Sequence, residues 1–269
     1  MVPKLQDILN LLDEMAPFSM AEEWDNSGLQ VGSLSLEVKR ILVALDPTLK
    51  AVRNASERKA QLLLTHHPLI FNALSCINSD IYPGDVITEA LKRDVSIVAA
   101  HTNLDAAKGG INHILANILG LQDVEVLSEI NDSGDHEIGI GRIGSLPRPM
   151  RLSDVIEIIK DVFDLKKLMV MGHKDKKIGK IAVVGGAGGG MAPLASRKGA
   201  DLLVTGDIKH HEALLAETMG LALIDGGHFY TEKKALSLFA DLLRDRLEER
   251  GWNIILETYE DEQESMRYE

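Results

Sequence analysis

The sequence predicts an α/β protein with two similar lobes, each built on a mostly parallel sheet. Its 269 residues amount to about two domains of roughly 150 residues each. Short apolar runs typical of buried strands alternate with amphipathic helical segments, which is the pattern of βαβ units. Residues 41–65 also match residues 181–205 at a constant offset of 140, and residues 95–105 match residues 222–232. Two related halves explain this repetition, and the alternative is the composition that all βαβ units share.

The first predicted lobe spans residues 1–124 and also includes the end of the chain, residues 233–269. A helix is expected at residues 3–15, where leucine and isoleucine recur at helical spacing after a proline in the first turn. Strands and helices then alternate along the chain. The predicted strands are 40–46, 61–65, 95–100 and 252–257, and the further predicted helices are 49–59, 84–93, 111–119 and 231–249.

The second predicted lobe spans residues 125–232. It begins where the pattern weakens, with a predicted turn at residues 131–135 that is rich in Asn, Asp, Ser and Gly. Ser153 is predicted to cap the first helix of this lobe. The predicted strands are 137–144, 167–171, 180–184, 201–205 and 221–225, with helices in the gaps.

Composition and charge exclude several classes of protein. The net charge of −12 disfavours non-specific binding to nucleic acid or to anionic membranes. No apolar run approaches the roughly 18–20 residues that span a bilayer, and acidic residues occupy the amino terminus where a signal peptide is apolar. We therefore expect a cytoplasmic protein that binds no membrane. The acidic end, residues 257–269, is expected to be solvated.

The single cysteine, Cys76, excludes an internal disulfide and a zinc site made of cysteines alone. Any metal site must therefore use histidine and carboxylate ligands. Six of the nine histidines lie at or a few residues beyond the ends of predicted strands, and ligands of open α/β sheets bind beyond the carboxyl ends of the strands. These histidines are His66, His67, His101, His210, His211 and His228.

The pair His66 and His67 precedes Pro68, which favours an extended or turn geometry and ends the strand. Both imidazoles can then converge on a ligand, because adjacent residues of a regular strand face opposite ways. Two alternatives remain for this pair. One histidine binds a metal while the other orients it, or both histidines are structural.

Two histidines are followed by a carboxylate four residues later: His101 by Asp105, and His228 by Glu232. At this spacing the two side chains lie on the same side of a helix, and they can also converge within a loop. The alternative to a metal site is an ordinary pair of side chains on the surface of a helix. Imidazole with carboxylate suits Zn, Fe, Mn, Co or Ni as divalent ions. Three histidines and two carboxylates are more ligands than one catalytic zinc site uses. They suit a site with two ions about 3.5–4 Å apart.

Three further features have weaker interpretations. The glycine run at residues 185–190 lacks both G-x-G-x-x-G and Gly-Lys-Ser/Thr, so it indicates either a phosphate contact or a close-packed turn. In the segment 21–32, Asp25 and Asn26 are candidates for substrate contact; the alternative is a capped turn anchored by Trp24. His211 is expected in the first turn of a helix, facing either the crevice or the surface.

Five motifs together resemble the GTP cyclohydrolase 1 type 2 family, also called Nif-three-like proteins. In order along the chain they are EEWDNSGLQVG from Glu22, LTHHPLIF from Leu64, AHTNLDAAKGGIN from Ala100, VTGDIKHH from Val204 and IDGGHFYTE from Ile224. The resemblance spans nearly the whole chain and is closest to the shorter members, which lack an extra domain between the halves.

This resemblance implies a dinuclear metal site in the cleft between the two lobes. Its ligands would be His66, His67, Asp105, His228 and Glu232, and His101 would lie beside them as the catalytic residue. The resemblance also implies a toroidal homohexamer and hydrolytic opening of the purine ring of GTP with release of formate. The substrate is then a small molecule, a nucleotide, and nucleic acid is not an expected partner.

The acidic composition counts against a triphosphate substrate, because Arg53 and Lys209 are the candidate cations that we can name. Two other functions therefore remain open. One is a metallophosphatase or another dinuclear hydrolase, which formate release distinguishes from a cyclohydrolase. The other is a toroidal metal-binding scaffold that is not an enzyme, for which loss of metal would change no reaction rate.

Overall fold

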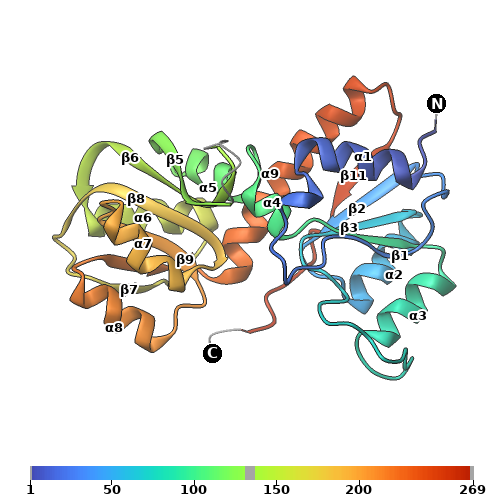
Figure 1. Cartoon of the computed structure of the whole chain (residues 1–269), viewed down its shortest axis with the longest axis horizontal. Helices are drawn as coiled ribbons and strands as arrows, with labels where there is room; N and C mark the ends of the chain where they lie inside the picture. Colours follow the sequence, from blue (N-terminus) through green and yellow to red (C-terminus); the bar gives the residue numbers. More distant parts are fainter. Residues whose placement is uncertain (1, 131–136, 267–269) are drawn as a thin grey trace. The chain divides into compact units, whose positions relative to one another are not determined.

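The computed structural model describes residues 2–130 and 137–266. The predicted turn at residues 131–135 lies outside the described residues. The chain folds into two compact units: unit 1 comprises residues 1–104 and 236–269, and unit 2 comprises residues 105–235 (Figure 1). The sequence predicts the first boundary between residues 124 and 125. In the structure the segment after residue 104 joins unit 2, because helix α5 (Ile111–Ile118) packs against strands of that unit.

Unit 1 contains a five-stranded sheet with the order β1-β4-β3-β2-β11. All of its pairings are parallel except that of β1 with β4, so the prediction of a mostly parallel sheet is confirmed for this unit. The strands are β1 (Gly28–Val31), β2 (Arg40–Ala44), β3 (Leu62–Thr65), β4 (Ser96–Ala99) and β11 (Ile255–Thr258). The helices are α1 (Leu5–Met15), the 3-10 turn η1 (Phe18–Met20), α2 (Leu49–Glu57) and α3 (Gly84–Lys92).

Helices cover both faces of this sheet. Figure 1 shows α2 and α3 on one side and α1 on the other. On the α2 and α3 side, alternate strand residues such as Leu42, Leu63 and Ile97 form a buried cluster with Val52 and Ile87 of the helices. On the other side, α1 buries its leucine and isoleucine stripe as the helical spacing predicts. Burial on both faces explains why these strands are short continuous apolar runs.

Unit 2 contains a six-stranded mixed sheet with the order β5-β6-β8-β9-β10-β7. The strands are β5 (Gln122–Glu129), β6 (Gly139–Arg151), β7 (Met169–Met171), β8 (Lys177–Ala187), β9 (Leu202–Gly206) and β10 (Ala222–Asp225). Here the prediction of a mostly parallel sheet is wrong. Three of the five pairings are antiparallel, because β5, β6 and β8 form a meander at one side and β7 runs against β10 at the other.

The helices of unit 2 are α5, α6 (Leu152–Phe163), α7 (Ala192–Arg197) and α8 (His210–Thr218), with the 3-10 turn η2 (Gly189–Met191). Alanines of α7 and α8 pack into one apolar cluster with Ala182, Leu203 and Leu223 of the sheet. The predicted cap at Ser153 is wrong. Helix α6 begins at Leu152, two residues earlier than a cap at Ser153 predicts, and Arg151 occupies the cap position.

Two helices cross the boundary between the units in sequence: α4 (Thr102–Ala106) and α9 (His228–Glu249). The strand order and directions β7-β10-β9-β8 repeat those of β1-β4-β3-β2. The self-matching residues also occupy equivalent registers, since Ile41 pairs with Leu62 and Ile181 pairs with Leu202. Similarity of the whole lobes stays a prediction. No helix in the described part of the chain is both long and apolar enough to span a bilayer.

The end of the chain belongs to unit 1. Strand β11 lies parallel to β2, and the Glu262 carboxylate then accepts hydrogen bonds from the N–H groups of Leu45 and Asp46 at 2.8 and 2.7 Å. Glu257 accepts hydrogen bonds from Arg40 and Arg58. The expectation of a solvated acidic end is therefore wrong for these two glutamates.

Replacing Glu262 with alanine removes the acceptor for two N–H groups just beyond β2. We expect Glu262→Ala to lower the free energy of unfolding by about 1–3 kcal/mol, the cost of unsatisfied polar groups, in urea denaturation. The exposed neighbour Asp261 is the matched control, and Asp261→Ala should stay within about 0.5 kcal/mol of wild type. Equal stability of the two variants would contradict this role of Glu262.

Candidate metal centre

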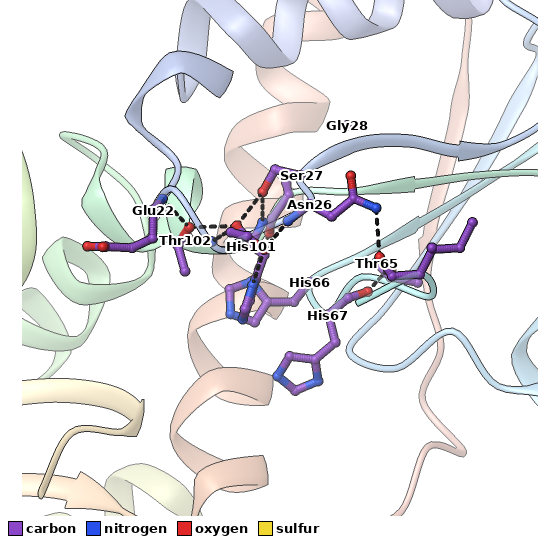
Figure 2. Close-up of polar contacts among 12 residues, drawn as sticks. Glu22, Asn26, Ser27, Gly28, Thr65, His66, His67, His101 and Thr102 are labelled. Atoms are coloured by element: carbon purple, nitrogen blue, oxygen red, sulfur yellow. Dashed lines mark hydrogen bonds and ion pairs between the residues drawn. The ribbon is translucent and has the colours of Figure 1, made fainter. Parts of the chain in front are cut away.

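Three histidines lie at the carboxyl end of the unit 1 sheet, where parallel strands end side by side. The register aligns Ala44 of β2, Thr65 of β3 and Ala99 of β4. His66 and His67 follow β3 directly, and His101 follows β4 after one residue. Figure 2 shows the three imidazole rings gathered at this end of the sheet. The predicted placement of these histidines beyond the ends of strands is confirmed.

The turn after β3 explains how two adjacent imidazoles converge. The N–H of His66 donates to the carbonyl of Ala44 at 3.2 Å, and the N–H of His67 donates to the next carbonyl, that of Leu45, at 3.0 Å. Adjacent residues of a regular strand cannot both donate to the same neighbouring strand. The regular strand has therefore ended before this pair, as Pro68 predicts.

The three rings form a tight trio. Their centroids lie 5.2 Å apart for His66 and His67, 5.2 Å for His66 and His101, and 5.6 Å for His67 and His101. One nitrogen from each ring lies within 4.8 Å of the other two. His66 is fully buried, whereas the other two rings are partly exposed. Three imidazole nitrogens at this spacing can surround a single metal ion.

Each ring is held through its Nδ1 atom. The acceptors are the Ala100 carbonyl for His66, the Asp46 carboxylate for His67 and the Asp25 carboxylate for His101, each at 2.8 Å. A carbonyl or carboxylate oxygen only accepts, so Nδ1 carries the proton in all three rings. In a neutral ring the lone pair is then on Nε2, the atom that a metal or a proton can take. Histidines that bind metal are usually oriented in this way.

Asp25 accepts several hydrogen bonds, one of which comes from His101. Its carboxylate accepts from the His101 ring, from the Ser27 hydroxyl at 2.8 Å, and from both the N–H and the hydroxyl of Thr102 at 3.1 and 2.5 Å. Burial alone would raise the pKa of Asp25. The hydrogen bonds from His101 and Thr102 outweigh burial and hold this pKa well below its usual range. Asp25 therefore stays ionised and orients His101, whereas the sequence proposes it for substrate contact.

Unit 2 contributes a second pair of candidate ligands. Helix α9 begins at His228, three residues earlier than predicted, and this places His228 and Glu232 on adjacent turns. The Nε2 atom of His228 and a carboxylate oxygen of Glu232 lie 3.0 Å apart, while Nδ1 of His228 is 2.7 Å from Asp207. Glu232 is buried. Of the two geometries considered for this four-residue spacing, the pair therefore adopts the helical one. As in the unit 1 histidines, the Nδ1 atom of His228 lies against an oxygen acceptor.

The glycine run makes room for this pair. Gly186 has a φ of +64°, and a Cβ atom there would lie 2.1 Å from Oε1 of Glu232 and 3.1 Å from Nε2 of His228. At Gly206, a Cβ atom would lie 2.4 Å from the backbone nitrogen of His228. Of the two interpretations of the run, the structure favours the close-packed turn. Glycine is needed because the backbone runs against the candidate ligands.

Asp105 lies in α4, and buried polar groups hold its backbone. Asn112 donates to the carbonyl of Asp105 at 3.1 Å and accepts from the N–H of Gly185 at 2.9 Å. Arg142 is buried and donates to the carbonyls of the next two residues, Ala106 and Ala107. Among the residues that the structure describes, Asp105 does not join a group of three converging donor atoms. Its role as a ligand stays a prediction.

Asn26 and His211 are the other two residues that the sequence predicts to contact substrate. The Asn26 amide donates to the carbonyl of Ile70 at 2.6 Å and so joins two loops. His211 lies in the first turn of α8, as predicted, and is exposed. Substrate contact by either residue stays a prediction.

The donor atoms fit divalent transition metals. Imidazole nitrogens and buried carboxylates suit Zn, Fe, Co, Ni and Mn. The one cysteine, Cys76, is exposed and does not belong to either group of converging donor atoms among the described residues. The chemistry of the donor set therefore agrees with a metal centre.

Comparison with known proteins identifies the family. Residues 3–264 match the family described as Duf34/NIF3, NGG1p interacting factor 3. The chain belongs to the Duf34/NIF3 family.

Several relatives share nearly the full length of the chain. A Clostridium perfringens protein named GTP cyclohydrolase 1 type 2 homolog is 38% identical over 245 residues, which cover 91% of this chain and 93% of the relative. A Clostridium acetobutylicum protein of the same name is 35% identical over 250 residues, with 93% of each chain covered. The crystal structure of a Bacillus cereus protein related to NIF3 matches with a TM-score of 0.92 and 28% identity over 99% of both chains.

For this Duf34/NIF3 protein, sequence reasoning missed the groups that hydrogen-bond to the candidate ligands or to the backbone beside them. They are Asp46, Asp207, Asn112 and Arg142. Asp46 and Asp207 each follow a strand that neighbours a histidine-bearing strand. Their position at strand ends was therefore a usable signal, whereas nothing in the local pattern marks Asn112 or Arg142.

Gly186 tests the close packing in this Duf34/NIF3 protein. Gly186→Ala adds a Cβ atom against Glu232 in a left-handed backbone conformation, and we expect a loss of about 1–3 kcal/mol of unfolding free energy in urea. Gly190 is the matched control, because an added Cβ atom there would meet nothing within 4 Å and its φ is not left-handed. Gly190→Ala should stay within about 1 kcal/mol of wild type. Comparable losses at both positions would contradict the close-packing interpretation.

Proposed function

We propose that this chain is a metal-dependent hydrolase that binds two divalent transition-metal ions. The proposed ligands are His66, His67, Asp105, His228 and Glu232. The observation that carries the proposal is the arrangement of the histidines. Each one is held at Nδ1 by a carbonyl or carboxylate and therefore presents Nε2 as a ligand atom.

Divalent ions in such a centre supply Lewis-acid activation of water and of the substrate. The chain's own contribution is to hold the ligand atoms before any ion binds. Asp46 and Asp207 keep the Nδ1 protons of His67 and His228 in place. Because the rings are already oriented, little side-chain entropy is lost when they bind an ion.

His101 is the proposed group for proton transfer. Its Nδ1 atom donates to the ionised Asp25, so Nε2 is the atom that can take a proton and return it. Proton transfer by a positioned side chain contributes roughly 10²- to 10⁴-fold in rate. Asp25 stabilises the protonated ring, which is the form that exists after His101 has accepted a proton.

The proposed reaction is hydrolytic opening of a purine ring with release of formate, on a nucleotide substrate. The names of the relatives support this choice, since they are GTP cyclohydrolase 1 type 2 homologs. Arg53 and Lys209 are the two cations considered as partners of a substrate phosphate. Of these, Arg53 already forms an ion pair with Glu89, with 2.9 Å between its Nε atom and a carboxylate oxygen. We also propose a homohexamer in the cytoplasm that needs neither a membrane nor nucleic acid as a partner.

Metal content and formate release, measured on the same preparation, test this function. We expect about two ions per chain in wild type and metal-dependent formate release from GTP. His67→Ala and Glu232→Gln should each lose metal and activity. His173→Ala is the matched control, because that ring is exposed and its nearest carboxylate lies 3.8 Å away.

Three results would argue against parts of the proposal. Two ions without formate would keep the metal centre and exclude GTP ring opening, and phosphate release from simple esters would then indicate a metallophosphatase. Loss of metal in Glu232→Gln without any change in rate would indicate a scaffold. Wild type that binds no metal after reconstitution would contradict the ligand assignment itself.

The orienting role of Asp46 gives a separate prediction. Asp46→Ala removes the acceptor for the Nδ1 proton of His67, so we expect metal affinity to fall by about 10- to 100-fold. Asp46→Asn keeps an acceptor oxygen and should lose less. Competition with a chelator of known affinity measures both values. Equal affinities of wild type and Asp46→Ala would show that this hydrogen bond does not matter for metal binding.

A further inference from the structure

An exposed pair of aromatic rings adjoins the histidine trio of unit 1. Trp24 has 56% of its surface exposed, and Phe71 has 50%. Their ring centroids lie 5.7 Å apart with the planes tilted by 46°. On its other side, Trp24 meets the ring of His101 in an edge-to-face contact with centroids 5.9 Å apart. We call Trp24 and Phe71 the aromatic platform.

Hydrogen bonds fix the two loops that carry the platform. Beside Phe71, the backbone of Ile70 is bound on both sides: its carbonyl accepts from the Asn26 amide at 2.6 Å, and its N–H donates to the Gln30 amide oxygen at 3.1 Å. Beside Trp24, the side chain of Asp25 is bound to Thr102 and His101. The platform therefore rests on fixed backbone at both rings, although half of its apolar surface faces solvent.

The two segments that carry the platform have no permanently positive side chain. Residues 21–32 and 65–83, the two segments that carry the rings, contain no lysine or arginine. These segments therefore offer no lysine or arginine to bind a phosphate. What they offer is aromatic surface, with the polar groups of the metal centre at one edge.

We propose that the aromatic platform binds the planar heteroaromatic ring of the substrate, a purine base, by stacking next to His101. This deepens the proposed function and rests on it for the identity of the reaction. Aromatic side chains stack on any base, because every base has a π-face. A ring stacked on Trp24 would lie on a side chain that contacts His101, the group proposed to move a proton. Fixed aromatic side chains bind with little loss of conformational entropy.

Other exposed apolar residues follow Phe71 in the same loop, namely Leu74, Ile77, Ile81 and Tyr82. They would suit contact with another protein copy. The contact with His101 is what favours a ring ligand for Trp24 and Phe71, since a surface used only for assembly needs no link to the metal centre. Assembly is therefore an outcome that the test must separate from stacking.

The probe is 2-aminopurine riboside, whose fluorescence is quenched when it stacks on aromatic rings. It is titrated into full-length, metal-loaded protein. We expect Trp24→Leu and Phe71→Leu each to weaken binding by about 5- to 100-fold. Trp24→Phe keeps an aromatic ring and should retain most of the affinity. Leu91→Ala, on exposed apolar surface of α3, is the control and should bind as wild type does.

Several outcomes would overturn the platform. These are wild type that does not bind the riboside, or unchanged binding in both leucine variants. A change of assembly size in Trp24→Leu with unchanged riboside binding would also overturn it, since the rings would then serve contact between copies. Metal content and formate release on the same samples separate the two proposals. If riboside binding depends on Trp24 but no formate is released, the platform is supported and the cyclohydrolase reaction is excluded. If formate is released and the KM of Trp24→Leu equals that of wild type, the cyclohydrolase reaction is supported and the platform is excluded.

Discussion

A hydrogen bond at Nδ1 orients every histidine on which the proposed function depends. In His66 the acceptor is a backbone carbonyl, and in His67, His101 and His228 it is an aspartate. The bond fixes the tautomer and the direction of the ring, and so decides which nitrogen is offered to a ligand. Without it, each ring could rotate and present either nitrogen.

For His67 and His228, the fold supplies the aspartate through the alignment of parallel strands, whereas Asp25, the acceptor for His101, precedes β1, which is antiparallel to β4. In unit 1 the carboxyl ends of β2, β3 and β4 carry Asp46, the histidine pair and His101 in turn. In unit 2, β9 and β10 end next to each other and carry Asp207 and His228. The acceptor and the histidine therefore come from neighbouring strands. In these two pairs, an acidic side chain at the end of one strand accepts a hydrogen bond from the imidazole at the end of the neighbouring strand.

The same alignment explains what could be predicted from the sequence. Buried strands such as β2 and β3 are continuous apolar runs, and a histidine after such a run marks the ligand edge of the sheet. The antiparallel strands of unit 2 were harder to predict. Strand β5 is half exposed and shows no regular apolar alternation, and β7 has three residues. No local pattern marks β5, whereas β7 was predicted as a strand at residues 167–171 and only its antiparallel direction was not.

Tertiary contacts decide the remaining features. The partnership of Asp46 with His67 depends on the register of β2 with β3, which no local pattern encodes. The need for glycine at position 186 arises from Glu232, which is far away in sequence. The end of the chain is acidic and looks like a solvated tail, yet Glu262 binds the backbone beside Asp46. Each of these residues interacts with a segment that folding brings to it.

The central claim is that the histidines bind metal through Nε2 because Nδ1 is already held. A crystal structure of the metal-loaded protein, with anomalous scattering recorded at the metal edge, tests it most directly. The account predicts anomalous peaks at about 2.0–2.2 Å from Nε2 of His66, His67 and His228, with the Nδ1 hydrogen bonds intact. Metal bound through Nδ1, or peaks only at other residues, would contradict it.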